Sequence, residues 1–242
     1  MMLHEASSFL TLTFSDEYLP PSYSVDVRDM QLFMKRLRKR IGKPVRFFAC
    51  GEYGETNLRP HYHLILFGYD FPDRYPWRKT GSGFVTYRSA ELEQVWWMGN
   101  AEIGTVTQES AGYVARYVLK KVNGQMADDH YRRIHPLTGE IVNVAPEFVT
   151  MSNKPGIGSG WYDKYSMDAF PSDFVIINGE KRPVPRYYKK KLDEETADEI
   201  TAKRKQEARK RAADNTPERL AVREEVLTLR LDQLTRELDD NQ

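Results

Sequence analysis

Two histidines separated by one residue, His61 and His63, stand at the start of an apolar run in this 242-residue sequence. Side chains alternate with period two along a strand, so both imidazoles leave the same face of residues 60–67. If residues 45–53 pair with 60–67 as an antiparallel hairpin in which position 53 faces position 60, Glu52 lies directly opposite His61. Two imidazoles and a carboxylate would then converge on one point, which predicts a divalent-metal site. This mixed set is compatible with Mn²⁺, and Mg²⁺ is the more oxygen-preferring alternative.

Two tyrosines, Tyr113 and Tyr117, lie four residues apart in a segment, residues 108–122, whose apolar spacing predicts a helix. Together with Lys120 they share one helical face at positions i, i+4 and i+7, and Lys121 borders that face. The adjacent face is expected to pack on a sheet, and it holds Ala111, Val114, Ala115, Val118 and Val122.

A metal site and a tyrosine together predict phosphodiester transesterification. The cation would polarise the scissile phosphate while a tyrosine oxygen attacks phosphorus, giving a covalent phosphotyrosine and a free 3′-hydroxyl. With two tyrosines, one can hold a DNA 5′ end while the other cuts again. Most His-x-His pairs in strands are structural and most tyrosine pairs are packing residues. Two alternatives therefore stay open: a non-enzymatic nucleic-acid-binding protein whose tyrosines stack bases, and a metal nuclease that uses water.

The surrounding elements must position these groups. Residues 9–14 read as a strand, and residues 26–41 as an amphipathic helix with a basic outer face that Gly42 and Pro44 end. Residues 69–83 are expected to be a loop in which aromatic residues alternate with cations, a composition that can contact nucleic acid. The remaining expectations run in chain order: a strand at 84–88, a short helix at 89–97 with Ser89 as its N-cap, a strand at 101–107, a loop-rich region at 124–190 and a charged tail with a helix from Thr216-Pro217.

Composition limits the class of protein. The 36 basic and 35 acidic residues give a net charge of +1, so any nucleic-acid footprint must be local. Cys50 is the single cysteine of the sequence, which fits a reducing compartment, and no apolar run approaches the ~20 residues of a membrane helix. We expect an intracellular protein with three parts: a core at 1–125, an extension at 126–190 and a helical tail at 191–242.

Several of these motifs resemble those of one enzyme family. His61-Tyr62-His63 resembles the paired-histidine motif of the HUH endonucleases that start rolling-circle replication. The segment from Tyr113 to Lys120 is similar to that family's two-tyrosine motif, and Phe9-Leu-Thr-Leu-Thr-Phe14 to its first motif. The segments Cys50-Gly-Glu-Tyr-Gly54, Met151–Trp161 and Pro185–Tyr188 resemble the initiators of small single-stranded-DNA phages, the gokushovirus branch of the microviruses. The resemblance covers about residues 9–190.

The resemblance implies an α+β fold with a central antiparallel sheet and helices on one face. It implies nicking of a phage origin and later rejoining of the strands, with Tyr117, Tyr113 and Lys120 as catalytic residues and Glu52 as third metal ligand. Arg116 stands where two-tyrosine relatives often carry lysine, which favours Tyr117 as the first nucleophile. Lys121, Arg116 and Arg59 are expected to contact DNA. Host helicase and polymerase would be partners, in the host bacterial cytoplasm.

Overall fold

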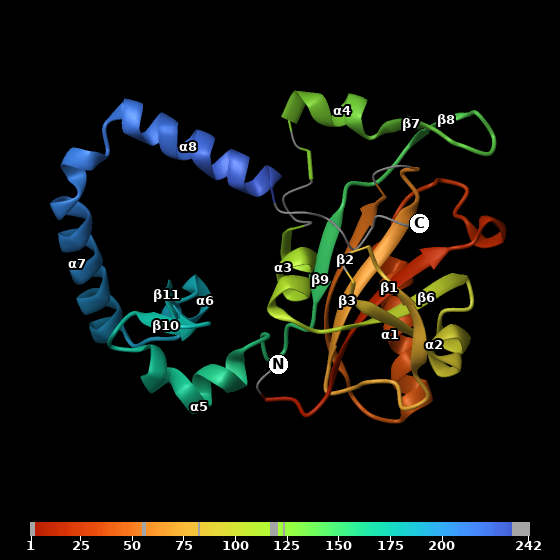
Figure 1. Ribbon diagram of the computed structural model, residues 1–242, viewed down its shortest axis with the longest axis horizontal. Helices are drawn as coiled ribbons and strands as arrows, with labels where there is room; N and C mark the ends of the chain where they lie inside the picture. The colour runs from red at the N-terminus through yellow and green to blue at the C-terminus, as the bar shows by residue number, and fades with distance from the viewer. Residues whose placement is uncertain (1–2, 55–56, 82, 117–120, 123, 234–242) are drawn as a thin grey trace. The chain divides into compact units, whose positions relative to one another are not determined.

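The computed structural model describes residues 3–54, 57–81, 83–116, 121–122 and 124–233 (Figure 1). These residues form two compact units, one up to Ile157 and one from Gly158. The sequence analysis instead divides the chain after residues 125 and 190, and that functional division stays a prediction. No helix among the described residues is long and apolar enough to cross a membrane.

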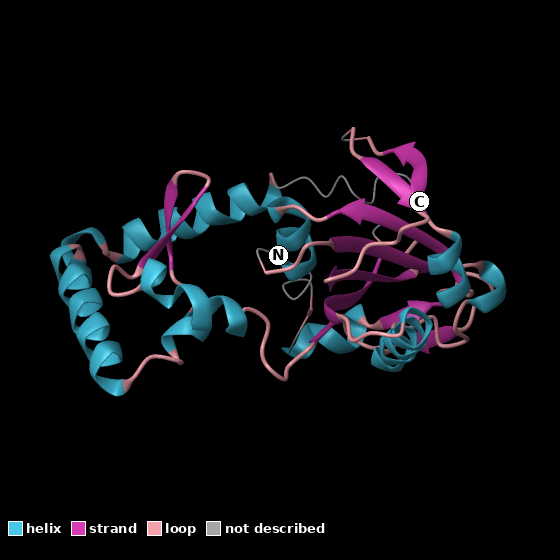
Figure 2. Cartoon of the chain, turned by 90° about the horizontal axis from the view of Figure 1, so that it is seen from below, coloured by secondary structure: helices cyan, strands magenta, loops and turns pink. Residues whose placement is uncertain are grey.

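A seven-stranded antiparallel sheet organises the first unit (Figure 2). Its strands lie in the spatial order β4-β5-β6-β1-β3-β2-β9. The elements of this unit are β1 (Ser7–Phe14), η1 (Asp16–Tyr18), α1 (Val27–Ile41), β2 (Arg46–Tyr53), β3 (Pro60–Phe67), β4 (Tyr75–Lys79), β5 (Val85–Arg88), α2 (Ala90–Val95), β6 (Gly99–Thr105), α3 (Gln108–Arg116), η3 (Gly124–Met126), α4 (Ala127–His130), β7 (Arg132–Ile134), β8 (Ile141–Asn143) and β9 (Phe148–Met151).

The two faces of the sheet carry different helices. One face packs on α1 and α2 in a large apolar core, at whose centre Trp96 is fully buried and donates from its indole nitrogen to the Thr13 carbonyl at 3.1 Å. The other face meets α3, with Tyr113 and Val114 packed against Phe9. The expected α+β class with a central antiparallel sheet is confirmed, and the structure adds that α3 lies on the face opposite α1.

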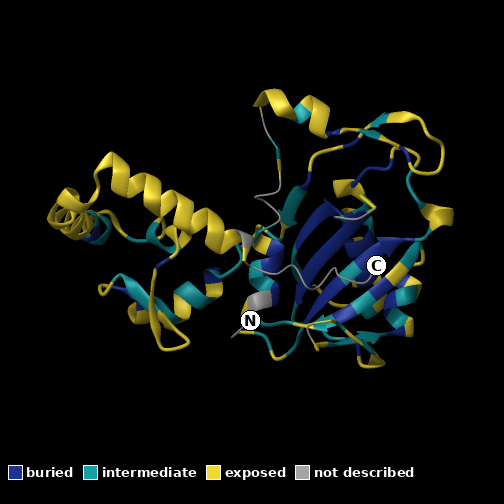
Figure 3. Cartoon of the chain, turned by 45° about the horizontal axis from the view of Figure 1, so that its top comes forward, coloured by how far each residue is buried: buried dark blue, intermediate teal, exposed yellow. Residues whose placement is uncertain are grey.

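The second unit is small and mostly helical. A minor core of Ala169, Phe170, Val184 and Ile200 holds it together, while the described residues of α8 are exposed (Figure 3). Its elements are α5 (Ser159–Ala169), β10 (Phe174–Ile177), β11 (Glu180–Pro183), α6 (Arg186–Lys189), α7 (Glu194–Lys210), η4 (Ala212–Asp214) and α8 (Pro217–Asp232), the last capped by Thr216 with proline at its first turn, as predicted.

The segments that resemble phage initiators near residues 158 and 188 come together in this unit. Tyr188 stacks on both Trp161 and Tyr162, with ring centres 5.2 and 5.7 Å apart. Gly158 has a φ of +83°, and a Cβ atom there would lie 2.6 Å from the Tyr188 hydroxyl. Glycine is therefore needed both for the backbone conformation and for the close approach of the ring.

Three expectations about local structure are wrong. Residues 75–79, expected in a loop, form the edge strand β4, whose mostly exposed residues give no apolar alternation; Pro76 is tolerated because the strand lies at the edge of the sheet. The region 124–190 contains several helices and strands, and its β9 joins the central sheet beside β2. Residues 121–122 are not helical, so the expected helix does not extend to 122.

The middle residue of the histidine motif fastens the sheet to α1. Tyr62 points to the face opposite the histidines, where its ring is fully buried. Its hydroxyl accepts from the Asp26 backbone N–H at 2.9 Å and donates to the Asp29 carboxylate at 2.7 Å. Burial raises the pKa of the Asp29 carboxyl, and the hydrogen bond from Tyr62 opposes that rise.

Tyr62→Phe should destabilise the protein by about 1–3 kcal/mol, since it leaves a partly buried carboxylate without this donor. The substitution also raises the folded-state pKa of Asp29, so the loss should be full at neutral pH and should shrink as pH falls through that pKa. Urea unfolding of both proteins at several pH values measures this. The exposed Tyr18→Phe is the matched control. A loss that is the same at all pH values would contradict the assigned role of Asp29.

Candidate active site

The hairpin of β2 and β3 has the register that the sequence predicts. Glu52 is paired with His61, and Tyr53 with Pro60. The next pair of that ladder on the same face joins Cys50 and His63. The assumed hairpin is therefore confirmed, and it sets the carboxylate and both imidazoles on one face of the sheet.

These three side chains are buried and already in partial contact. His63 is 1% exposed, and its Nε2 lies 2.9 Å from Oε1 of Glu52, which is also 1% exposed. The His61 ring is parallel to that of His63, with the ring centres 6.4 Å apart. A buried carboxylate needs such a partner, because an unpaired charge in the interior is very costly.

Further hydrogen bonds orient the two rings. His61 Nδ1 lies 2.5 Å from the Arg59 carbonyl oxygen, which can only accept, so the ring donates from Nδ1. In a neutral imidazole, Nε2 then carries the lone pair. His63 Nδ1 lies 3.1 Å from the Thr11 hydroxyl. A contact from the second ring nitrogen to a carbonyl or other polar group is the arrangement that holds metal-ligating histidines in place.

The fit to a divalent metal is partial. The 2.9 Å between His63 Nε2 and Glu52 Oε1 equals the ~3 Å between neighbouring ligands of an octahedral ion with bonds of about 2.1 Å. Among the described residues, however, no group of three or more histidine, cysteine, aspartate or glutamate side chains is arranged to hold a metal ion as it stands. The donor types and one donor–donor spacing fit, and the metal site stays a prediction.

The tyrosine helix lies against this face. Thr107 and Ser110 begin α3 with reciprocal hydrogen bonds, in which each hydroxyl oxygen accepts from the other residue's backbone N–H. Tyr113 is 4% exposed, and its ring meets that of His63 edge-on with centres 5.3 Å apart. It also contacts Phe9. The structure thus brings one predicted nucleophile directly beside the predicted metal ligands.

The buried stripe of α3 differs from the expected one. Ser110, Tyr113 and Val114 are buried, whereas Ala115 is exposed and does not pack on the sheet. The large aromatic ring of Tyr113 gains more from burial than the methyl group of Ala115, so the helix is turned toward the tyrosine. Tyr117 and Lys120 lie outside the described residues, and their roles stay predictions.

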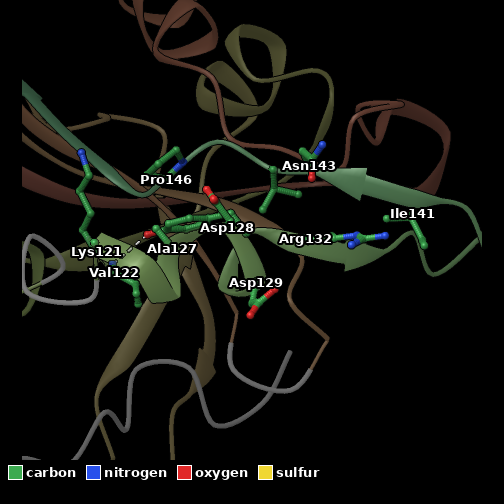
Figure 4. Close-up of a pocket in the computed structure, with 12 residues that line it drawn as sticks. Lys121, Val122, Ala127, Asp128, Asp129, Arg132, Ile141, Asn143 and Pro146 are labelled. Carbon is green, nitrogen blue, oxygen red and sulfur yellow. Dashed lines mark hydrogen bonds between the residues drawn. The ribbon is translucent and has the colours of Figure 1, made fainter.

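The three residues expected to contact DNA lie in different places. Arg59 donates to the Phe14 carbonyl and pairs with Asp16, and it lines a groove of about 580 Å³ that also contains His61. Arg116 is the last described residue of α3 and is half-buried. Lys121 is exposed and lines a separate cavity of about 790 Å³ formed largely by α4, β7 and β8 (Figure 4). The two linings share no residue.

Thr11 is a residue of this site that the sequence analysis did not single out. Its hydroxyl faces His63, and Phe9 of the same strand stacks on the His63 ring at 5.8 Å. The signal was present in the alternation of the strand at 9–14, because the face that carries Phe9 also carries Thr11 and Thr13. A polar residue at a position that faces a helix is the pattern to look for.

Fold and site together define an α+β protein with two histidines, a carboxylate and a tyrosine buried on one face of its sheet. Residues 7–122 match the family model of the replication-associated protein ORF2 family. The chain is 35% identical over 190 residues to replication-associated protein VP4 of Bdellovibrio phage phiMH2K, covering 74% of this chain and 56% of that protein. No solved structure matches the chain.

Two further relatives carry the same kind of name. Replication-associated protein ORF2 of Spiroplasma virus 4 is 27% identical over 223 residues, covering 86% of this chain and 64% of that protein. Replication-associated protein ORF4 of Chlamydia phage 1 is 29% identical over 195 residues, covering 77% and 46%. The chain thus spans about half to two thirds of these relatives' lengths. Residues 7–122, which hold His61, His63, Glu52 and Tyr113, belong to the replication-associated protein ORF2 family, and the resemblance to phage replication initiators is confirmed.

Glu52→Gln should weaken Mn²⁺ binding by about tenfold or more, because it removes the anionic donor while keeping an oxygen that can accept from His63. Isothermal titration calorimetry of the purified protein measures the affinity. Glu17→Gln, an exposed acidic residue of η1, is the control and should bind as the unsubstituted protein does. Equal affinities for the two variants would remove Glu52 from the ligand set.

Thr11→Val should weaken Mn²⁺ binding by about tenfold through the orientation of the His63 ring, since the hydroxyl contacts Nδ1 and not the metal position. Thr11→Ser keeps the hydroxyl and should restore the affinity. The same calorimetric titration compares the three proteins. If serine and valine at position 11 weaken binding equally, the hydroxyl does not orient the ligand.

Proposed function

We propose that this chain is a replication initiator that nicks single-stranded origin DNA by metal-assisted tyrosine transesterification and later rejoins the strands. The observation that carries the proposal is the edge-on contact of Tyr113 with His63, at a ring-centre distance of 5.3 Å, on the face where His63 also meets Glu52. Nucleophile helix and electrophilic site are thereby adjacent. Membership of the replication-associated protein family supports the same biological role.

The donor set would be His61, His63 and Glu52, with Mn²⁺ or Mg²⁺ as the ion. When bound, the ion would act as a Lewis acid on the scissile phosphate. The hydrogen bond between His63 and Glu52 occupies the same space, so His63 must give up its Nε2 proton, or stop donating it to Glu52, to serve as a ligand. Thr11 and the Arg59 carbonyl hold the two rings meanwhile.

The reaction proposed for the tyrosine is balanced as follows. The phenol loses its proton, its oxygen forms a bond to phosphorus, and the bond from phosphorus to the 3′-oxygen breaks. The released oxygen takes up a proton to give a free 3′-hydroxyl, which a host polymerase can extend. The 5′-phosphotyrosine preserves the phosphodiester for the later rejoining reaction, in which a 3′-hydroxyl attacks and the phenol leaves.

Tyr117 is the proposed first nucleophile, and Lys120 the proposed partner of the phosphate. The support is the motif, in which Tyr117 stands three residues before a lysine, together with the deep packing of Tyr113. A side chain that is 4% exposed must move before it can meet a polymeric substrate, whereas its ring already supports His63. Tyr113 would then serve in the second cut or in rejoining.

Tyr117→Phe should abolish the first covalent adduct with a single-stranded origin oligonucleotide and Mn²⁺, while Tyr113→Phe should retain it. The adduct is detected as an SDS-resistant shift. Trypsin cleaves after Arg116 and Lys120, so the two tyrosines fall in different peptides, 89–116 and 117–120, and mass spectrometry of the trimmed adduct identifies the one used. An adduct on 89–116 would make Tyr113 the first nucleophile.

A non-enzymatic role in binding single-stranded DNA is the second candidate, and the existing bond between Glu52 and His63 favours it, because these groups satisfy each other without a metal. It predicts binding without any adduct. Cleavage that persists in the Tyr113→Phe, Tyr117→Phe double variant would instead indicate a nuclease that uses water. In either event host helicase and polymerase remain the proposed partners within the host cell.

A further inference from the structure

The groove of about 580 Å³ beside His61 is built for more than access to the histidine. Thr13 and Asn100 lie on its sheet floor, and Trp77 of β4 and Arg88 of β5 line it on the side of the sheet edge. Its volume lies within the range of small-molecule binding sites. The groove therefore offers room for one small group immediately next to the predicted metal ligands.

A β-bulge directs two consecutive side chains of β4 into this groove. Tyr75 pairs with Arg88 and Arg78 pairs with Thr86, so three residues of β4 span two of β5, with the irregularity at Trp77. Regular alternation would send Trp77 and Arg78 to opposite faces, but both line the groove. Bulges that re-aim side chains are common at sheet edges and next to functional sites.

The Trp77 indole is held in place yet largely open. It is 51% exposed, and the Arg88 guanidinium lies 4.7 Å from its ring centre. Arg88 is itself fixed by a 2.6 Å ion pair with Glu93 of α2. A large aromatic side chain with an ordered cation against it and half of its surface in solvent is a ready stacking platform.

The charges of the groove favour a base over a phosphate. Each arginine on its lining has an acidic partner among the described residues: Arg59 with Asp16, Arg78 with Glu102 at 3.0 Å, and Arg88 with Glu93. Phosphate binding depends on uncompensated positive charge, which this groove lacks. Asn100, exposed at the floor, can instead both donate to and accept from the edge of a base.

We infer that the groove binds one unpaired nucleobase of single-stranded DNA, stacked on Trp77, next to the phosphate that reaches His61. Duplex DNA does not fit this role, because the faces of its bases are covered by their neighbours. The inference rests on the proposed function for the choice of DNA as ligand. The binding itself is separate from the chemistry and can be measured without cleavage.

The experiment compares an oligothymidylate of about 12 nucleotides with an abasic oligomer of the same length. Fluorescence anisotropy gives both affinities in the presence of EDTA, so that metal-dependent cleavage cannot interfere. Trp77→Ala should reduce the preference for the thymidylate by about 5- to 150-fold, the effect of losing one base–aromatic stack. Trp77→Phe keeps an aromatic face and should retain most of the preference.

Trp97→Ala is the matched control, because Trp97 is 54% exposed and does not line the groove; it should bind as the unsubstituted protein does. Photocrosslinking with 5-bromodeoxyuridine adds a direct readout, since the tryptic peptide 75–78 contains Trp77 and peptide 89–116 contains Trp97. The crosslink should map to 75–78.

An unchanged preference in Trp77→Ala, a crosslink confined to other peptides, or equal binding of both oligomers by the unsubstituted protein would each overturn the inference. The two proposals fail separately. A protein that forms the tyrosine adduct but shows no role for Trp77 lacks the base site alone. A protein that shows Trp77-dependent binding but no adduct has the base site without the nicking reaction.

Discussion

The antiparallel register of β2 on β3 is the constraint on which this site depends. It sets Glu52 opposite His61 and leaves His63 within hydrogen-bonding distance of the same carboxylate. A slip of one residue would turn Glu52 toward the apolar core around α1, where a carboxylate has no partner. The same slip would break the contact of Gly51 with Phe148, where a Cβ atom would lie 2.4 Å from the aromatic ring. Burial on both faces of the sheet therefore enforces the register, and the register assembles the polar set.

The alternation of the histidine strand divides the work between the two faces. His61 and His63 face α3, while Tyr62 between them is bonded to the start of α1. The helix that carries Tyr113 can therefore meet the histidines on one face while the other face is anchored. The groove with Trp77 continues the histidine face toward the β4 edge of the sheet. Nucleophile helix, ligand pair and base site thus share one surface, with the histidine pair between the other two.

The site was more predictable than the elements around it. Strand period and hairpin length were enough to place Glu52 opposite His61, because side-chain direction along a strand has few alternatives. The edge strands β4 and β9 were missed since short, exposed or isolated segments carry little apolar periodicity. The rotation of α3 was missed because equal weight was given to Ala115 and Tyr113, although the ring contributes far more buried area. Thr11 was overlooked because a single hydroxyl in an apolar strand has many ordinary explanations, and its contact with His63 depends on strand order, which the local sequence does not specify.

The claim at the centre of this account is that one face of the sheet forms a metal site from both histidines of the pair. Electron spin echo envelope modulation of the Mn²⁺-loaded protein, with histidine labelled by ¹⁵N, reads the metal's nitrogen ligands directly. The account predicts ¹⁵N couplings from two imidazoles that disappear in the His61→Ala, His63→Ala double variant. Bound Mn²⁺ without histidine nitrogen coupling, or couplings that survive the double variant, would contradict it.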